Sequence, residues 1–158
     1  NTHYYQDFDL VVARHPSENE SRMMFRLLAF LYCAHEELEF TKGISTQEEP
    51  DIWHKDYCGE VLHWIELGLP DEKRIRQACG RSHKVSIFTY HHNKAQEWFA
   101  KIKDKFINNN KVHIHHFKVL GEIALEAITN KNMSLSCIIE DNQIHISNDD
   151  LRITIEVN

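Results

Sequence analysis

A strand–helix–strand pattern near the middle of the chain is the feature that most restricts its fold. Residues 60–67 carry bulky side chains on both faces, which is typical of a central strand buried on both sides. A helix is expected over residues 70–80, because Pro70 suits the first helical position and two acidic residues follow it. Residues 84–90 are rich in β-forming side chains. This alternation over about thirty residues predicts a parallel unit with a right-handed crossover.

Periodicity in the rest of the chain predicts further elements around this unit. Helices are expected at residues 18–38, 94–107 and 120–131. Further strands are expected at residues 4–13, 39–45, 52–57, 112–116, 134–140, 143–147 and 151–157. We therefore expect one α/β domain over residues 1–158, with a mixed sheet flanked by helices. The N- and C-terminal strands are expected to form a second, small antiparallel sheet.

Composition excludes several classes of protein. The 158 residues carry a formal net charge of −6, which argues against nucleic-acid binding over the whole surface. No apolar run approaches the roughly 20 residues of a membrane span. The four cysteines form no Cys-x-x-Cys pair, which favours buried, reduced thiols in a cytoplasmic protein over disulfides. They are Cys33, Cys58, Cys79 and Cys137.

The twelve histidines invite a zinc hypothesis, which their spacing does not support. The densest groups are His91-His92 and His113-x-His115-His116. Neither has a cysteine or carboxylate at a diagnostic spacing, and the chain contains no His-Glu-x-x-His motif. We expect these histidines to lie on the surface or on edge strands.

Two sets of motifs in this chain resemble known proteins. Pro50-Asp51, followed after fourteen residues by Glu66-Leu67-Gly68, resembles the PD…(D/E)XK signature of the restriction-endonuclease-like superfamily, with glycine in place of the final lysine. Longer stretches resemble the YaeQ family, namely His15-Pro16-Ser17-Glu18, Arg22 to Phe30, Phe40-Thr41-Lys42-Gly43 and Trp64 to Arg74. The resemblance covers nearly the whole chain. It implies a restriction-endonuclease-like fold, a further strand ahead of Asn1, and no settled activity.

Three acids are the expected metal ligands of such a site: Glu36, Asp51 and Glu66. Carboxylates hold hard divalent cations such as Mg²⁺, for which Mn²⁺ can substitute. Glu66 interrupts an apolar strand, where a carboxylate is costly to bury unless it is hydrogen-bonded or bound to a metal. The resemblance favours Glu36 on the first helix, but periodicity leaves Glu37 equally open.

Alternatives also remain for the second acid and for the base. Glu48 and Glu49 are close enough to Asp51 in sequence to replace it, and Pro-Asp is a common loop dipeptide. The position of the usual lysine is Gly68, which has no side chain. Lys73 or Arg74, one turn into the next helix, could reach back towards Glu66. Of these, Lys73 is the expected replacement and the fourth predicted catalytic residue after Glu36, Asp51 and Glu66.

Basic residues follow the predicted acid site. Over residues 71–84, five lysines and arginines against two acids give a net charge of +3. Arg74, Arg76 and Arg81 are the expected nucleic-acid-binding residues of this cluster, although a solvated helix face would look the same.

The sequence therefore favours a Mg²⁺-dependent phosphodiesterase that acts on DNA or RNA. The alternative is a nuclease-like domain that binds nucleic acid or a nucleoprotein partner without cutting it, in a regulatory role. A third possibility is a structural or regulatory protein in which the acids have no joint role.

Overall fold

The computed structural model describes residues 10–34, 37–42 and 47–158, and in these residues one curled sheet contains all the strands. Its order is β1-β2-β3-β4-β5-β8-β7-β6. The strands are β1 (Leu38–Phe40), β2 (Ile52–Lys55), β3 (Val61–Leu67), β4 (Ser82–Thr89), β5 (Val112–Leu120), β6 (Ser136–Glu140), β7 (Gln143–Ser147) and β8 (Arg152–Val157). The helices are α1 (Glu20–Tyr32), α2 (Glu72–Arg81), α3 (His92–Phe106) and the short 3₁₀ helix η2 (Leu125–Ile128).

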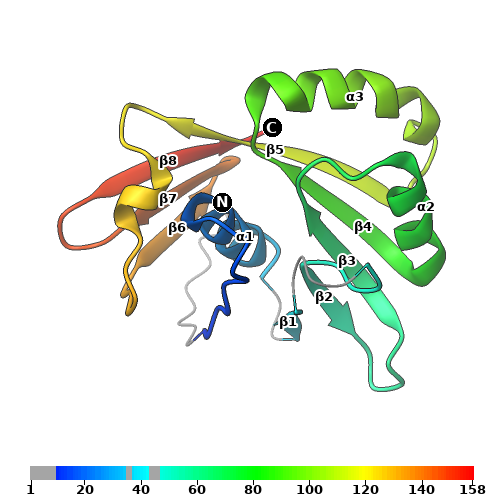
Figure 1. Cartoon of the computed structure of the whole chain (residues 1–158), viewed down its shortest axis with the longest axis horizontal. Helices are drawn as coiled ribbons and strands as arrows, with labels where there is room; N and C mark the ends of the chain where they lie inside the picture. The colour runs from blue at the N-terminus through cyan, green and yellow to red at the C-terminus, as the bar shows by residue number, and fades with distance from the viewer. Residues whose placement is uncertain (1–9, 35–36, 43–46) are drawn as a thin grey trace.

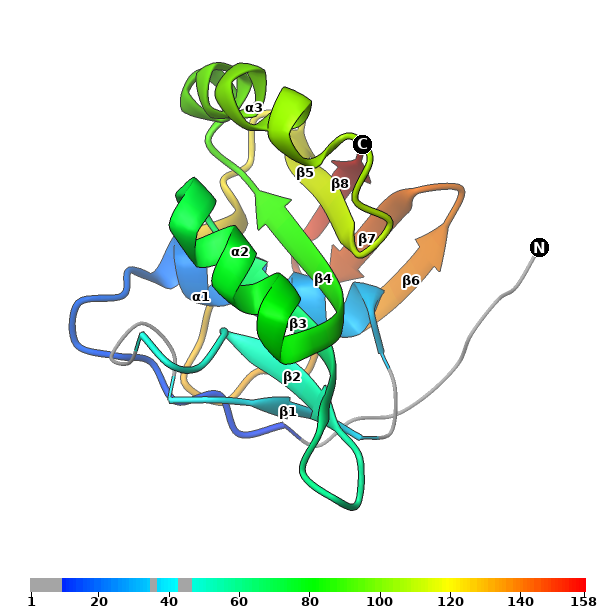
Figure 2. The ribbon, with the colours of Figure 1, turned by 90° about the vertical axis from the view of Figure 1, so that its right-hand side faces the viewer.

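The predicted strand–helix–strand unit is confirmed. Strands β3 and β4 pair in parallel and α2 connects them; β4 and β5 also pair in parallel, with α3 as the connection. Figures 1 and 2 show α2 and α3 on the outer face of this half of the sheet. There, Trp64 and Ile87 are buried in one apolar cluster with Ile75 of α2 and Ile102 of α3. The short corner of residues 68–71 between β3 and α2 brings the start of α2 to the carboxyl end of β3.

Helix α1 lies on the opposite, concave face, between the two halves of the curled sheet (Figure 1). Eight consecutive residues, 23–30, are buried, because strands approach the helix from both sides. Phe117 of β5 and Ile155 of β8 belong to the same apolar cluster as α1. Arg26 lies within the buried stretch and is only 1% exposed, so its charge needs a partner inside the protein.

The prediction of a separate second sheet was wrong for the described residues. Strand β5 is long enough to pair in parallel with β4 through residues 112–116 and antiparallel with β8 through residues 117–120. The C-terminal strands therefore extend the main sheet. Of the predicted N-terminal strand, residues 10–13 are not in a strand, and residues 4–9 lie outside the described residues.

The helix predicted at residues 120–131 was also wrong. Strand β5 continues to Leu120, and Gly121 then turns the chain with a φ of +84°. Only Leu125–Ile128 is helical, as one 3₁₀ turn whose end residues are buried in the α1 cluster. Pairing with β8 keeps Leu120 in the strand, and Leu125 and Ile128 pack into the α1 cluster as a single turn, so long-range contacts override the local helical spacing of apolar residues.

Helix ends differ from the prediction by a few residues. Helix α1 is shorter than predicted and starts after Asn19, whose side chain accepts a hydrogen bond from the Arg22 amide. Asp71 caps α2 in the same way, so Pro70 precedes the helix. Helix α3 begins at His92, two residues before its predicted start, and has no side-chain cap.

The cysteines are free, as predicted, but they are less buried than expected. Cys58 is exposed in the turn between β2 and β3, and the other three are partly buried. Burial raises the pKa of Cys33 to about 12 and that of Cys137 to about 11, which keeps these two thiols protonated and unreactive at neutral pH. None of the helices in the described ranges combines the length and apolarity needed to cross a bilayer.

Candidate functional site

A cavity of about 400 Å³ lies at the carboxyl end of β3, beside the first turns of α1 and α2. Its lining residues are Arg22, Gln47, Glu49, Pro50, Asp51, Glu66, Leu67, Asp71, Lys73, Arg74 and Gln77. Three of the four predicted catalytic residues, Asp51, Glu66 and Lys73, therefore face one space. The fourth, Glu36, lies outside the described residues.

Antiparallel pairing of β2 with β3 brings the two acids together. Ile52 pairs with Ile65, so the next position in this register sets Asp51 beside Glu66. Side chains opposite one another in such a pair lie close together on one face. Both acids are buried, with 4% of Asp51 and 9% of Glu66 exposed. Two carboxylates in so little water need positive or hydrogen-bonding neighbours.

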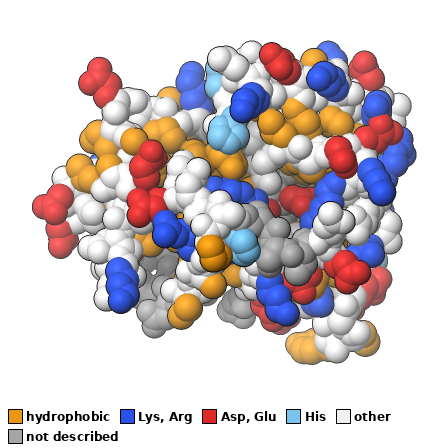
Figure 3. Space-filling view, in the orientation of Figure 1, with side chains coloured by type: hydrophobic (Ala, Val, Ile, Leu, Met, Phe, Trp, Pro, Cys, Tyr) orange, Lys and Arg blue, Asp and Glu red, His pale blue; other side chains and the backbone are white. Residues whose placement is uncertain are grey.

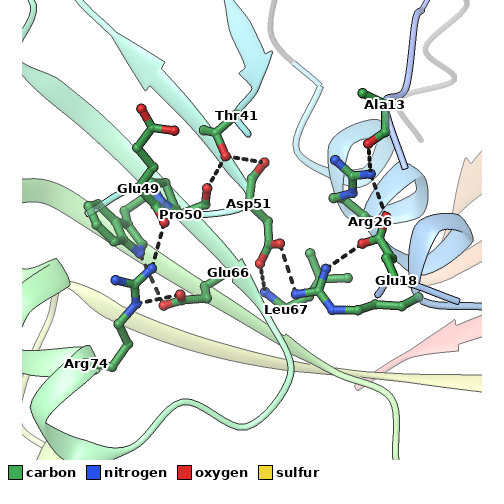
Figure 4. A network of polar contacts seen from close by, with 12 residues as sticks. Ala13, Glu18, Arg26, Thr41, Glu49, Pro50, Asp51, Glu66, Leu67 and Arg74 are labelled. Atoms are coloured by element: carbon green, nitrogen blue, oxygen red, sulfur yellow. Dashed lines mark hydrogen bonds and ion pairs between the residues drawn. The ribbon is translucent and has the colours of Figure 1, made fainter. Parts of the chain in front are cut away.

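Each oxygen of the Asp51 carboxylate accepts one bond (Figure 4). Oδ1 lies 3.0 Å from Nη2 of Arg22, on the first turn of α1. Oδ2 accepts the backbone N–H of Leu67 at 2.9 Å. The backbone of Asp51 is held as well, because its carbonyl accepts the Thr41 amide at 3.2 Å. These bonds fix the acid at the junction of α1, β2 and β3.

The Glu66 carboxylate is held by Arg74, one turn into α2. Oε1 accepts Nε of Arg74 at 2.7 Å, and Oε2 accepts the indole N–H of Trp64 at 3.3 Å. Burial raises the pKa of Glu66; Arg74 opposes this shift and the nearby Asp51 adds to it. A carboxyl whose pKa is raised by burial in a cavity is a frequent feature of functional sites.

The raised pKa of Glu66 makes stability depend on pH in a definite direction. Between the ordinary value of 4.5 and the folded-state pKa, this residue binds more protons in the folded protein than in the unfolded chain. Its contribution to the free energy of unfolding therefore falls as the pH rises through that window and is constant outside it. We expect the stability of the wild type relative to Glu66→Gln to fall over this range in urea unfolding at stepped pH. A relative stability that increases with pH would contradict the assignment.

A second ion-pair network reaches the cavity from α1 (Figure 4). Arg22 bonds Glu18 at 2.7 Å as well as Asp51, and Glu18 also holds Nη2 of Arg26 at 2.8 Å. Burial alone would lower the pKa of Arg22, but Asp51 and Glu18 outweigh burial and raise it. Burial raises the pKa of Tyr90, which follows the carboxyl end of β4, and the nearby charge of Arg22 opposes that shift.

These additional site residues were missed at the sequence level. Arg22 and Glu18 occur in motifs that carry the family resemblance, but no spacing rule connects them to Asp51. The position of Tyr90 near the site could have been predicted, because residues that follow adjacent parallel strands lie at the same edge of a sheet.

Gly68, which occupies the usual lysine position, has a backbone role here. It adopts a φ of +103°, which favours glycine, and its N–H donates to the carbonyl of Phe88 at 2.9 Å. Lys73 and Arg74 are the nearest cations that α2 supplies to the cavity. Arg74 is in direct contact with Glu66, whereas Lys73 is exposed and has no ion pair among the described residues.

The three arginines predicted to bind nucleic acid already have partners within the protein. Arg74 donates to Glu66 and to the carbonyls of Gln47 and Glu49, the latter at 2.7 Å. Arg76 pairs with Glu72 at 2.8 Å, and Arg81 donates to the carbonyl of Glu48 at 3.2 Å. Figure 3 shows acidic and basic side chains interspersed over the face it presents. Arg76 and Arg81 nevertheless remain exposed.

The alternative acids contribute little to the cavity. Glu37 is exposed and lies 3.7 Å from His54 of β2. Glu48 is exposed and does not line the cavity. Glu49 does line it, but its carboxylate points away from Glu66 (Figure 4). Asp51 is thus the acid of this loop that pairs with Glu66.

The side chains that line the cavity suit a hard divalent cation such as Mg²⁺. No group of three or more metal-binding side chains occurs in the part of the chain that the structure describes, the histidine groups included. Mg²⁺, however, is usually held by one or two carboxylates together with water and substrate phosphates. Asp51 and Glu66 provide such a pair of hard oxygen ligands, so the donor set fits Mg²⁺ held jointly with a phosphate.

Comparison with known proteins gives one consistent result. The family described as "YaeQ protein" matches residues 1–157. The "Uncharacterized protein YaeQ" of Escherichia coli (strain K12) is 39% identical over 155 residues, which are 98% of this chain and 84% of that protein. Its counterpart from Salmonella typhi is 39% identical and is matched over 83% of its length.

Two solved structures have the same fold. The YaeQ protein from Xanthomonas axonopodis pv. citri matches with a TM-score of 0.90 and 34% identity, over 98% of this chain and 87% of that one. The YaeQ protein from Pseudomonas syringae matches with a TM-score of 0.84 and 30% identity, over 98% and 86%. The mixed α/β architecture is therefore shared with these bacterial proteins.

Proposed function

This chain belongs to the YaeQ family, and we propose that it is a Mg²⁺-dependent phosphodiesterase that acts on nucleic acid at the cavity between Asp51 and Glu66. The observation that carries the proposal is the composition of one cavity. Two buried carboxylates from adjacent strands face it together with the cations Arg22, Lys73 and Arg74. Acids that hold a metal beside cations that face a phosphate are the minimal parts of such a site.

We further propose that the cavity is a variant of the PD-(D/E)XK site in a restriction-endonuclease-like fold. Asp51 and Glu66 stand at the two acid positions, and Gly68 at the lysine position. The cation comes instead from α2, which the corner after β3 brings back over Glu66. This support is the resemblance of the motif together with the meeting of its acids in one cavity.

Each residue has a distinct role in the proposal. Asp51 and Glu66 would hold Mg²⁺, which when bound neutralises charge on a phosphate and lowers the pKa of an attacking water. Lys73 is exposed at the cavity and free to approach a phosphate oxygen. Arg74 presents only N–H donors, so in the proposal it stabilises negative charge and does not act as a base.

A cleavage assay tests the proposal directly. Purified protein is incubated with end-labelled single- and double-stranded DNA and RNA, in Mg²⁺, in Mn²⁺ and in excess EDTA. We expect shorter products with either metal and none in EDTA. Full-length substrates after long incubation in both metals would overturn the assignment as a phosphodiesterase.

A second function is favoured by the pairing of the acids. All four carboxylate oxygens of Asp51 and Glu66 already accept a hydrogen bond, and Gly68 offers no catalytic side chain. This arrangement suits a regulatory protein that binds nucleic acid or a nucleoprotein partner and leaves it intact. Salt-sensitive binding in EDTA without any product would select this function, because phosphate contacts release counterions.

A further inference from the structure

We propose that Arg22 and Arg74 are exchangeable counter-cations, so that a divalent metal and a phosphodiester bind this site together and each binds poorly alone. The inference rests on the proposed phosphodiester site and adds that its metal and its phosphodiester bind cooperatively. It follows from which atoms hold the two carboxylates in the protein without ligand.

Both carboxylates are neutralised by arginine. Oδ1 of Asp51 lies 3.0 Å from Arg22, and Oε1 of Glu66 lies 2.7 Å from Arg74. The remaining oxygens accept N–H groups from Leu67 and Trp64. Each of the two buried carboxylates is thus matched by one guanidinium group in direct contact with it. A divalent ion that entered alone would add two uncompensated positive charges there, which is unfavourable away from water.

A phosphate changes this balance. Arg22 and Arg74 both line the cavity, so an anion that enters meets two guanidinium groups. Guanidinium matches phosphate geometry with paired N–H bonds and recognises it well. When the arginines turn to the phosphate, an oxygen of each acid is released for the metal. Mg²⁺ is commonly coordinated by carboxylate and phosphate oxygens together.

Each arginine keeps an anchor during this exchange. Arg22 has Glu18 at 2.7 Å, and Arg74 has the carbonyl of Glu49 at 2.7 Å. The side chains therefore change one partner and stay in the cavity. Neither guanidinium is fully enclosed, with 16% of the Arg22 and 18% of the Arg74 side chain exposed, so a phosphate can reach both from solvent.

Calorimetric titration measures the coupling. Mn²⁺ is titrated into the protein alone and into the protein with saturating dTpdT, and dTpdT is titrated with and without Mn²⁺. We expect each ligand to tighten the other by at least about tenfold and by the same factor, because binding couplings are reciprocal. Equal Mn²⁺ affinity with and without dTpdT would overturn the proposal.

Variants assign the effect to the arginines. In Arg74→Gln, Mn²⁺ alone is expected to bind about tenfold more tightly and the coupling to shrink, since one counter-cation is gone. Arg22→Lys retains the charge beside Glu18 and removes the paired N–H geometry, so the affinity for dTpdT should fall. Arg152→Gln, which changes an exposed arginine at the start of β8 outside the cavity, is the control and should match the wild type. Weaker Mn²⁺ binding in Arg74→Gln would show that this arginine only positions Glu66.

Product analysis of the same samples separates this inference from the proposed function. Coupled binding without cleavage supports the counter-cation inference and rejects the phosphodiesterase. Cleavage with uncoupled binding supports the phosphodiesterase and rejects the counter-cation inference. No Mn²⁺ binding by the wild type or by Arg74→Gln, with or without dTpdT, would reject both.

Discussion

Replacing Glu18 with glutamine is expected to lower the free energy of unfolding by about 3–5 kcal/mol. Glu18 is 5% exposed, and its two oxygens bridge Arg22 at 2.7 Å and Arg26 at 2.8 Å. Glutamine keeps the shape but removes the charge and one acceptor oxygen, so its NH2 group faces one of the two guanidinium groups and the buried Arg26 loses its ion pair. Urea unfolding of the two proteins at one pH measures the difference.

The neighbouring Glu20 provides a matched control. It is exposed at the start of α1, two residues after Glu18, and its carboxylate lies 3.9 Å from Arg14. An exposed pair of this kind contributes no more than about 1 kcal/mol, so Glu20→Gln should unfold almost as the wild type does. If Glu18→Gln were no less stable than Glu20→Gln, the ion pairs of Glu18 would not contribute to the stability of the fold. The site would then have to be fixed by β2 and β3 alone.

Replacing Glu66 with glutamine is expected to lower the rate of nucleic-acid cleavage by about 10³-fold or more. Metal-assisted charge stabilisation supplies several kcal/mol of barrier reduction, and each 1.4 kcal/mol is a factor of ten. Glutamine has nearly the same size, and its carbonyl oxygen can still accept the Arg74 bond, whereas its NH2 group then takes the place of the oxygen that accepts the Trp64 indole N–H. The loss would therefore report the missing ligand charge and not a collapsed site. Initial rates in Mg²⁺ over a range of substrate concentrations provide the measurement.

Glu60→Gln is the control for this experiment. Glu60 is exposed just before β3 begins, at the opposite end of the strand, and pairs with His83 at 2.7 Å. It should cleave at the wild-type rate. Thermal melting of both variants confirms that they are folded. A Glu66→Gln protein that cleaves as fast as Glu60→Gln would remove Glu66 from the catalytic set.

Much of the candidate site could be predicted from sequence because its parts lie on elements with strong local signals. Glu66 interrupts the apolar strand β3, and Asp51 follows a proline and directly precedes β2, the strand before β3 in the chain. The pairing of Ile52 with Ile65 brings these acids together, and a one-residue shift of that register would turn one of them to the other face. No local pattern specifies a register of this kind.

The cations of the site could not be assigned in the same way. The sequence left Lys73 and Arg74 both within reach of Glu66, and Lys73 was the predicted replacement for the lysine absent at Gly68, yet the side chain in contact with Glu66 is that of Arg74. Adjacent helical residues point about 100° apart, so which of them faces the strand depends on how α2 packs. Arg22 comes from α1, 29 residues before Asp51, and its contact with that acid exists only in the folded chain.

The sequence by itself determined the elements that are specified by hydrogen bonds and side-chain periodicity within a short stretch of chain. The corner after β3, helices α2 and α3, and the short C-terminal strands belong to this set, since capping residues and periodic side chains specify them within a few positions. Tertiary structure alone decided that the C-terminal strands continue the main sheet along β5 and that residues 117–120 are strand. It also decided that two arginines neutralise the paired acids. Strand pairing and ion pairing join residues far apart in the chain, and their energies depend on burial, which exists only once the chain has folded.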